Sequence, residues 1–405
     1  MNSEERKAAR RKRRKQERER RKAERNKGCT LEDIADMNAL YKAQREAGRG
    51  VTWKASTQRY QLDWLLNINR ARHDILEGNE VCRGFHEFDL YERGKMRHIS
   101  SVHFSERVVQ KSLTQNAYIP TIAPSFINDN TANIKGKGTA YALGRVKQAL
   151  VRHYRKHGSD GYALQIDFSS YFANITHEPV KQMIANAIED ERVVALGHHM
   201  VDVQGELGLG LGSEPNQILA VGFPNEIDHL VQDMCGVEYY GRYMDDTLII
   251  DSDKTKLRVV LAIVRDRCAK LGIIVNEKKT HITKLSHGFT FLKTKFSYSE
   301  TGKVVMRPCR DSITRERRKL KKQAHLVEQG LMTMEQVIQS YQSWRGSKLR
   351  LNAHETILRM DALFAELFAP KITAMKDPPR NPDPKNCLDL RTRFRAGFLL
   401  PEGGY

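Results

Sequence analysis

The chain has 405 residues, with 68 Lys or Arg against 49 Asp or Glu, so its formal net charge is +19 at pH 7. This length allows two to four packed units at roughly 100 to 200 residues per domain, and a hydrophobic content of 40% excludes wholesale disorder. The absence of a long apolar run and the charged N-terminus argue against a membrane-spanning or secreted protein. Six scattered Cys without a C-x-x-C pair favour a reduced, cytoplasmic protein.

The first 27 residues form a strongly basic block, with 14 Lys or Arg and 5 Glu. They lack an apolar stripe, so we expect a solvated helix or a mobile arm (residues 1–28) that does not pack into a core. The arm is either a solubilising tail or a phosphate-binding segment that gains affinity by counterion release. We favour phosphate binding, because the rest of the chain is also basic.

The chain up to residue 160 is predicted to be mainly helical, with one hairpin. Thr30 to Asp33 has the spacing of a capping box at the start of a helix. The extended segments at 84–99 surround the turn Glu92-Arg93-Gly94-Lys95. Apolar periodicity predicts helices over 30–46 and 62–75. A Ser cap begins a helix expected over 105–117, and Gly136-Lys137-Gly138-Thr139 precedes one expected over 139–157.

The middle of the chain is predicted to alternate helices with short strands. Strands are expected at 161–168, 237–243, 247–251, 273–276, 280–283 and 289–296, and helices at 176–188, 215–234 and 254–271. This order implies an α+β fold with helices on one face of an antiparallel sheet. After residue 310 the chain becomes helical and basic, and from Pro370 it is rich in Pro.

Three carboxylates on two elements carry the chemical argument. Asp167 ends a predicted strand, and Asp245 and Asp246 lie where two strands are joined. Consecutive strand residues point to opposite faces, so adjacent Asp residues approach one point only where the backbone turns. Such a cluster can hold two Mg²⁺ ions, or Mn²⁺ in their place, about 3.5 to 4 Å apart. The ordinary alternative is a solvated Asp-Asp turn.

The residues around these acids resemble the reverse transcriptase family. QIDFSSYFANI, from Gln165, is similar to its first palm motif, and Tyr243-Met244-Asp245-Asp246 is similar to its catalytic turn. The resemblance spans about 90–350 and implies a right-hand polymerase with fingers, palm and helical thumb. It divides the chain into the arm, N-terminal helices and fingers (29–160), palm with finger insertions (161–300), thumb (301–369) and a Pro-rich tail (370–405).

The resemblance implies an RNA-directed DNA polymerase that transfers dNTPs onto the 3′-hydroxyl of a DNA or RNA primer. Asp167, Asp245 and Asp246 would be catalytic and would bind the metal ions together with the backbone of Phe168. The expected template is a structured non-coding RNA. We expect no membrane association, and the oligomeric state is left open. The length after the palm leaves no room for an RNase H, integrase or endonuclease domain of typical size.

The resemblance also implies nucleotide-binding and nucleic-acid-binding positions. Arg93, Lys95 and Arg97 lie in a finger-strand motif that meets the triphosphate, although any exposed hairpin carries such charges. Phe172 matches the steric-gate aromatic that favours deoxynucleotides; as a plain alternative it is a core ring beside Tyr171. The remaining matched positions are Gly212 and Gln217 at the nascent base pair, Lys279 near the leaving pyrophosphate, and Lys137 near template or primer phosphates.

The first predicted thumb helix is basic on one side. Arg315, Arg318, Lys319 and Lys322 share a helix face, so they can follow one phosphate backbone, although a solvated face is the ordinary alternative.

One loop departs from the common family pattern. Many members have Gln-Gly at its start and Ser-Pro at its end, whereas this chain has Leu211-Gly212 and Asn216-Gln217. This pattern is more typical of defence-associated and diversity-generating bacterial enzymes, so we expect a defence or domesticated retroelement, with a diversity-generating element as the alternative. We hypothesise that DNA synthesis has relaxed fidelity, because Leu211 cannot hydrogen-bond the nucleotide or template as Gln can. A non-catalytic RNA-binding protein and untemplated synthesis stay open.

Overall fold

The computed structural model describes residues 3–92 and 94–374, and the chain divides into two compact units. Unit 1 comprises Met1–Leu292 and Phe296–Val304; unit 2 comprises Lys293–Lys295 and Val305–Tyr405. Helices predominate, and strands β1 to β6 pair antiparallel. The α+β prediction is therefore confirmed. Among the described helices none is long and apolar enough to cross a bilayer.

Unit 1 begins with five helices. They are α1 (Ser3–Asn26), α2 (Leu31–Ile34), α3 (Met37–Ala47), α4 (Ala55–Leu62) and α5 (Trp64–Glu77). The capping box at Thr30 and Asp33 is present, but the helix predicted over 30–46 is divided. It divides because the Asp36 carboxylate accepts the backbone N–H groups of Asn38 and Ala39 at 2.9 Å, which starts a new helix.

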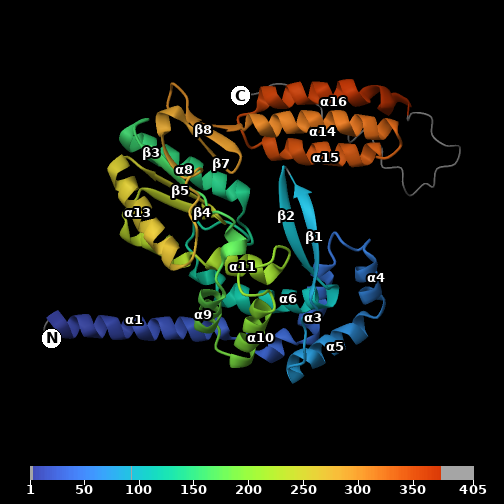
Figure 1. The fold of residues 1–405 in the computed structure, drawn as a ribbon. Coiled ribbons are helices and arrows are strands. Elements are labelled where there is room, and N and C mark those ends of the chain that lie inside the picture. The colour runs from blue at the N-terminus through green and yellow to red at the C-terminus, as the bar shows by residue number, and fades with distance from the viewer. Residues whose placement is uncertain (1–2, 93, 375–405) are drawn as a thin grey trace. The chain divides into compact units, whose positions relative to one another are not determined.

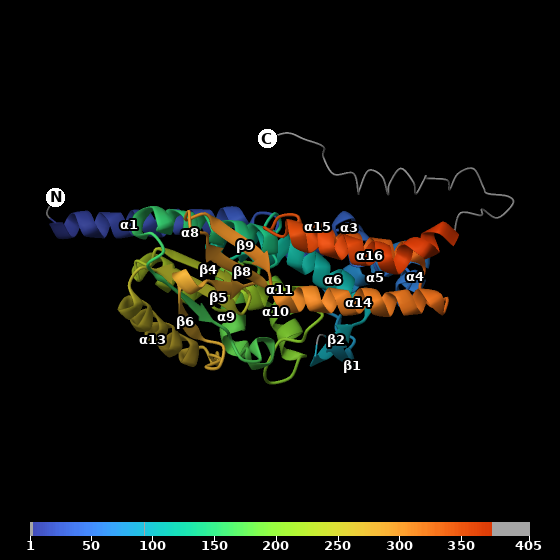
Figure 2. The same cartoon turned by 90° about the horizontal axis from the view of Figure 1, so that it is seen from above.

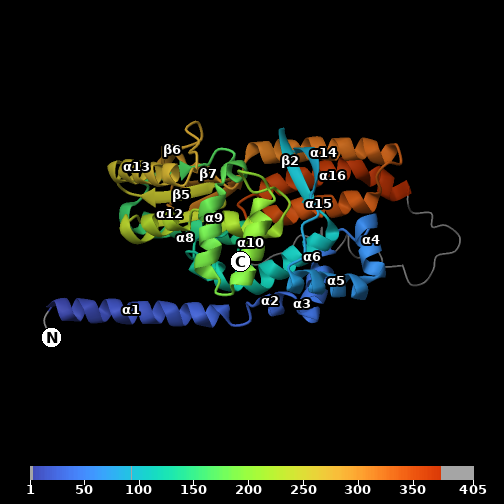
Figure 3. The ribbon, with the colours of Figure 1, turned by 60° about the horizontal axis from the view of Figure 1, so that its bottom comes forward.

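The basic block forms the single helix α1, which Figures 1 and 3 show extending beyond the other elements of unit 1. Its last residue, Asn26, is bonded to the turn after a later helix. The Asn26 amide donates to the Ala187 carbonyl at 3.0 Å and accepts the Glu189 N–H at 2.9 Å. Most of its other side chains are exposed.

A hairpin and further helices follow. The hairpin pairs β1 (Phe85–Glu92) with β2 (Lys95–Val102), and Glu92 lies opposite Lys95. The helices are α6 (Phe104–Leu113), a π-helical turn (Thr114–Tyr118), α7 (Ile119–Thr121), a 3-10 turn (Ala123–Ser125) and α8 (Thr139–His157). The bounds of α8 agree with the prediction.

A four-stranded antiparallel sheet is the centre of unit 1. Its order is β4 (Tyr239–Tyr243), β5 (Asp246–Asp251), β3 (Tyr162–Ile166) and β6 (His281–Lys284). Nearly every residue of β4 and β5 is buried, so both faces of the sheet are covered. α13 (Lys254–Lys270) packs against β5, and α8 contacts β4 (Figure 2). The expectation of helices on one face only is therefore wrong.

Other helices of unit 1 lie between β3 and β4 in the chain. They are a 3-10 turn (Tyr171–Asn174), α9 (His177–Ala187), α10 (Glu191–Asp202), α11 (Glu214–Gly222), α12 (Asn225–His229) and a π-helical turn (Leu230–Met234). α10 was not predicted. The single helix predicted over 215–234 is wrong, because Pro224 has no N–H to continue the α11 hydrogen-bond ladder.

A smaller sheet has the order β7 (Phe289–Phe291), β8 (Thr294–Tyr298) and β9 (Val304–Pro308), and the boundary between the two units falls within it. The strand predicted over 289–296 is divided by a turn in which Leu292 and Lys293 have φ of 45° and 60°. The strand predicted over 273–276 is reduced to one bridge, between Val275 and Phe168.

Unit 2 is built around three helices packed side by side (Figure 1): α14 (Arg310–Glu328), α15 (Met334–Lys348) and α16 (His354–Ala374). Their buried apolar residues form a core of their own: Leu320, Ala324, Met334, Val337, Tyr341, Met360, Phe364 and Phe368. α16 includes the first five residues of the predicted tail, 370–374. The rest of that tail lies outside the described residues.

Candidate active site

The register of the sheet brings the three predicted carboxylates to one place. Ile166 of β3 lies opposite Thr247 of β5, so one further step along the ladder puts Asp167 opposite Asp246. Residues that face each other on antiparallel strands have Cα atoms about 4.5 to 5.5 Å apart. Asp245 lies in the two-residue turn between β4 and β5, next to Met244, whose φ is +59°.

Asp167 is 8% exposed and is held by the segment after α13. The Lys279 ammonium donates to its two carboxylate oxygens at 2.8 and 2.7 Å, and the Asn276 amide donates to one of them at 3.1 Å. The Asn276 N–H also donates to the Asp167 carbonyl at 2.8 Å. The residue that the sequence linked to pyrophosphate therefore forms an ion pair with the first acid in this structure.

Lys279 lies within the electrostatic influence of all three acids. Its pKa is raised above the ordinary value, first by the hydrogen bonds with Asp167 and then by the negative charges of Asp167, Asp245 and Asp246. The cluster therefore combines Lys279 with the acid that follows β3, the acid in the turn and the first residue of β5.

A cavity of about 1280 Å³ opens beside this cluster. Seven of the residues predicted for the site line it: Arg97, Asp167, Phe168, Phe172, Gln217, Asp245 and Lys279. The Phe172 ring is half-buried and meets Tyr171 edge-on, with 5.8 Å between ring centroids. His98 also lines the cavity, but its ring is bonded to the Asp89 carboxylate at 3.0 Å on the hairpin.

The donor set fits a hard divalent cation. Asp167, Asp245 and Asp246 supply carboxylate oxygens, which Mg²⁺ and Mn²⁺ prefer. These three are not among the described groups whose ligand atoms all lie within 4.8 Å of one another. The Lys279 ammonium bonds both oxygens of Asp167, so it competes with a cation for this carboxylate.

Comparison with known proteins decides the family. The family model described as reverse transcriptase (RNA-dependent DNA polymerase) matches residues 86–296, just over half of the chain. This chain belongs to the reverse transcriptase family. A solved structure of apo telomerase from Candida tropicalis, truncated from its C-terminal domain, is similar at 14% identity with a TM-score of 0.41. The match covers 54% of each chain, so this reverse transcriptase spans about half the length of that relative.

The loop from Leu211 to Gln217 is held by local contacts. Gly212 has φ of +122°, and a Cβ there would lie 3.2 Å from the Ser100 carbonyl, so the loop requires glycine. The buried Asn216 amide donates to the Gly210 carbonyl at 2.9 Å and to the Gln204 side chain at 2.7 Å. Gln217 accepts a hydrogen bond from Asn133 at 2.7 Å. Leu211 lines the cavity.

The predicted finger cations are not all brought together. Arg97 of β2 lines the cavity, Lys95 begins the same strand, and Arg93 lies outside the described residues. The Lys137 ammonium donates to the Asn128 carbonyl at 2.7 Å, and Lys137 is not among the described residues of the cavity wall.

The predicted thumb cations belong to unit 2. Arg315, Arg318, Lys319 and Lys322 are all exposed on α14, and Lys319 also approaches Glu316 at 3.5 Å. The shared exposed face that the helical spacing predicts is therefore present.

Three residues that matter to the site's geometry were missed from the sequence: Asn276, Asp228 and Arg242. Asn276 lies three residues before Lys279, so its closeness to that predicted site residue could have identified it from the sequence. Arg242 is a lone charge in the buried strand Tyr239–Tyr243, and such a charge requires a buried partner. Nothing in the local sequence identifies Asp228 as that partner.

Proposed function

We propose that this reverse transcriptase is an RNA-directed DNA polymerase that joins dNTPs to the 3′-hydroxyl of a DNA or RNA primer. The observation that carries the proposal is the sheet register, which puts Asp167 opposite Asp246 beside the turn that carries Asp245. Asp167, Asp245 and Lys279 also line a large cavity. The sheet and its carboxylate turn would be the palm, β1 and β2 part of the fingers, and the helices of unit 2 the thumb.

The three Asp residues would hold two Mg²⁺ ions, or Mn²⁺ in their place, with the Phe168 backbone as a further ligand. When bound, the pair of cations supplies a lowered pKa for the primer hydroxyl and stabilisation of charge on the leaving oxygens. Lys279 would exchange its contact with Asp167 for the pyrophosphate. This exchange brings a positive charge to the position where negative charge develops.

Other residues of the cavity wall would select the nucleotide. Phe172 would lie under the sugar and exclude a 2′-hydroxyl, while Gly212 and Gln217 would border the nascent base pair. Arg97, with Lys95 and Arg93, would meet the triphosphate. Charged donors of this kind bind phosphate oxygens strongly.

The nucleic-acid partners would follow the exposed basic segments. Lys137 and the α14 residues Arg315, Arg318, Lys319 and Lys322 would contact template or primer phosphates, and α1 would extend this contact to a structured non-coding RNA. The cavity-lining Leu211 and the Asn216-Gln217 pair support a bacterial defence or domesticated retroelement, with a diversity-generating element as the second setting.

Primer extension with and without Asp245 tests the proposal. The full-length chain, a primed RNA template, dNTPs and Mg²⁺ should give extended DNA, and Asp245→Asn should abolish extension while it leaves RNA binding largely intact. Asp266→Asn, an exposed acid of α13, is the matched control and should extend normally. Full extension by Asp245→Asn would refute the assignment. RNase treatment of the template separates templated from untemplated synthesis.

A further inference from the structure

A lone arginine lies in a buried strand of the sheet, separated by one residue from the start of the carboxylate turn. Arg242 is 1% exposed, and its partner Asp228 is 0% exposed. A charge that is removed from water in this way must be paired and hydrogen-bonded, because an unpaired buried charge is strongly destabilising. Burial alone disfavours the charged guanidinium, yet Asp228 outweighs it and holds the pKa of Arg242 above its ordinary value.

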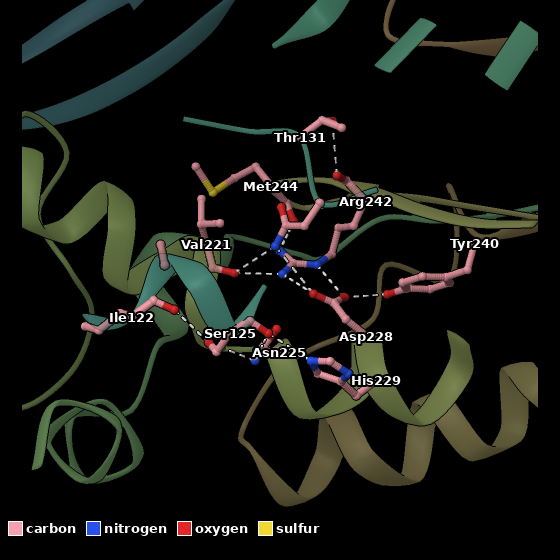
Figure 4. A network of polar contacts seen from close by, with 12 residues as sticks. Ile122, Ser125, Thr131, Val221, Asn225, Asp228, His229, Tyr240, Arg242 and Met244 are labelled. Carbon is pink, nitrogen blue, oxygen red and sulfur yellow. Dashed lines mark hydrogen bonds and ion pairs between the residues drawn. The ribbon is translucent and has the colours of Figure 1, made fainter. Parts of the chain in front are cut away.

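The pair has the geometry of a planar fork, shown in Figure 4. The Arg242 Nε donates to one oxygen of Asp228 at 2.7 Å, and its Nη2 donates to the other at 2.6 Å. The Tyr240 hydroxyl donates to the same carboxylate at 2.6 Å. Asp228 lies on α12, the short helix that begins after Pro224, so the break in the predicted long helix places this acid under β4.

The rest of the guanidinium holds the turn and the end of α11. Its Nη1 donates to the Met244 carbonyl at 2.9 Å, and its Nη2 also donates to the Val221 carbonyl at 2.7 Å. Met244 is the first residue of the two-residue turn and has φ of +59°, which is uncommon for a residue with a side chain. Its carbonyl belongs to the peptide group that leads into Asp245, so Arg242 fixes the peptide that aims this carboxylate.

The backbone of Arg242 ties the turn to a second segment. Its N–H donates to the Asp129 carbonyl at 3.0 Å, and its carbonyl accepts the Thr131 N–H at 3.1 Å. The Arg145 guanidinium donates two hydrogen bonds to the Asp129 carboxylate, at 2.6 and 2.8 Å. One residue therefore joins α12, the segment around residue 130 and the carboxylate turn.

We propose that Arg242, fixed by Asp228, is a positioning residue that sets the direction of the Asp245 and Asp246 carboxylates toward the divalent cations. The inference rests on the proposed function, because it assigns those carboxylates to cation binding. Lysine cannot replace Arg242, since an ammonium has no planar fork that reaches Asp228 and the Met244 carbonyl together.

The chain contains a matched control for this substitution. In unit 2 the Arg345 guanidinium and the Tyr341 hydroxyl both donate to Asp361, at 3.0 to 3.1 Å and 2.6 Å. Arg345→Lys therefore damages an arginine–carboxylate–tyrosine group of the same composition on a separate unit. Any general effect of an Arg-to-Lys change on folding should be seen in both variants.

The test compares wild type, Arg242→Lys, Arg345→Lys and Asp245→Asn in full-length protein by three measurements. Mn²⁺ titration followed by electron paramagnetic resonance gives cation binding without any nucleic acid. Primer extension against Mg²⁺ concentration gives the half-saturating Mg²⁺, and thermal unfolding gives stability. Arg242→Lys should raise both half-saturating concentrations about tenfold, the usual effect of losing a residue that orients metal ligands. Arg345→Lys should leave both within about twofold of wild type, although it lowers the unfolding temperature.

An Arg242→Lys protein that unfolds earlier but keeps both cation midpoints would show a purely structural role and overturn the proposal. If Arg242→Lys fails to fold, Asp228→Asn decides, because it keeps the shape of the side chain and one acceptor for the guanidinium. A rise of about threefold or more in the half-saturating cation concentrations of Asp228→Asn supports the proposal. Unchanged half-saturating concentrations overturn it. A wild type that binds Mn²⁺ through Asp245 but extends no primer would refute the polymerase function alone, since the Mn²⁺ titration still decides the role of Arg242.

Discussion

Removing the Lys279 ammonium should have opposite effects on cation binding and on nucleotide transfer. In the structure this ammonium bonds both oxygens of Asp167, so it competes with a cation for that carboxylate. The Lys279 side chain is 53% exposed, so the ion pair is screened by solvent and is worth about 1 kcal/mol. That energy corresponds to about a fivefold change in an equilibrium constant. Lys279→Met should therefore bind Mn²⁺ about fivefold more tightly than wild type.

The same variant should transfer nucleotides more slowly, because it lacks the cation that we assign to the leaving pyrophosphate. Loss of one such electrostatic contact lowers kcat by about 100-fold or more. The raised pKa of Lys279 adds a pH criterion. Because its pKa is raised, Lys279 stays charged and paired below the ordinary value of 10.5, and the pair is lost only as the pH rises through the raised value. Each of the two effects should therefore be the same at neutral pH as at mildly alkaline pH.

Cation titration and single-turnover extension measure these two effects separately. Lys278→Met is the matched control, because Lys278 is the adjacent exposed lysine and makes no described ion pair or side-chain hydrogen bond. It should match wild type in both assays. Unchanged Mn²⁺ affinity in Lys279→Met would show that the ammonium does not compete for Asp167. A normal kcat together with tighter Mn²⁺ binding in Lys279→Met would show that Lys279 takes no part in nucleotide transfer.

Two further predictions concern the sugar and the RNA. Phe172→Ala should lower the preference for dNTPs over ribonucleotides by about tenfold or more in single-nucleotide extension, because the half-buried ring no longer excludes the 2′-hydroxyl; an unchanged preference would make Phe172 a packing residue only. Replacing Arg10, Arg13 and Arg14 of α1 with Gln should reduce the salt dependence of RNA binding by about 0.7 to 0.9 in log–log slope per lost phosphate contact. An unchanged slope would leave α1 as a solubilising helix.

The parts of the fold that the sequence predicted well depend on local signals. α8 was predicted with its observed bounds, because the glycine segment before it is a local signal. The Asp167 strand and the Asp245-Asp246 turn were also predictable, since β-strand patterns and an acid at the end of each are local features. Their convergence followed from the antiparallel pairing of two neighbouring strands.

The parts that failed depend on long-range contacts. Pro224 marked a possible break, but only the structure shows that the break places Asp228 against Arg242, which lies 14 residues further along the chain. The contact between Lys279 and Asp167 joins residues 112 apart, so no local pattern predicts it. The second covered face of the sheet was missed although Leu248-Ile249-Ile250 is a continuous apolar run, a pattern consistent with a strand buried on both faces.

The central claim is that Asp167, Asp245 and Asp246 share divalent cations, and anomalous diffraction from crystals grown with Mn²⁺ and a non-hydrolysable dNTP measures this directly. We predict two Mn²⁺ peaks about 3.5 to 4 Å apart, with carboxylate oxygens of Asp167 and Asp245 on both and the Lys279 ammonium moved away from Asp167. Mn²⁺ found only at other acids, or a retained Lys279–Asp167 pair beside bound nucleotide, would contradict the account.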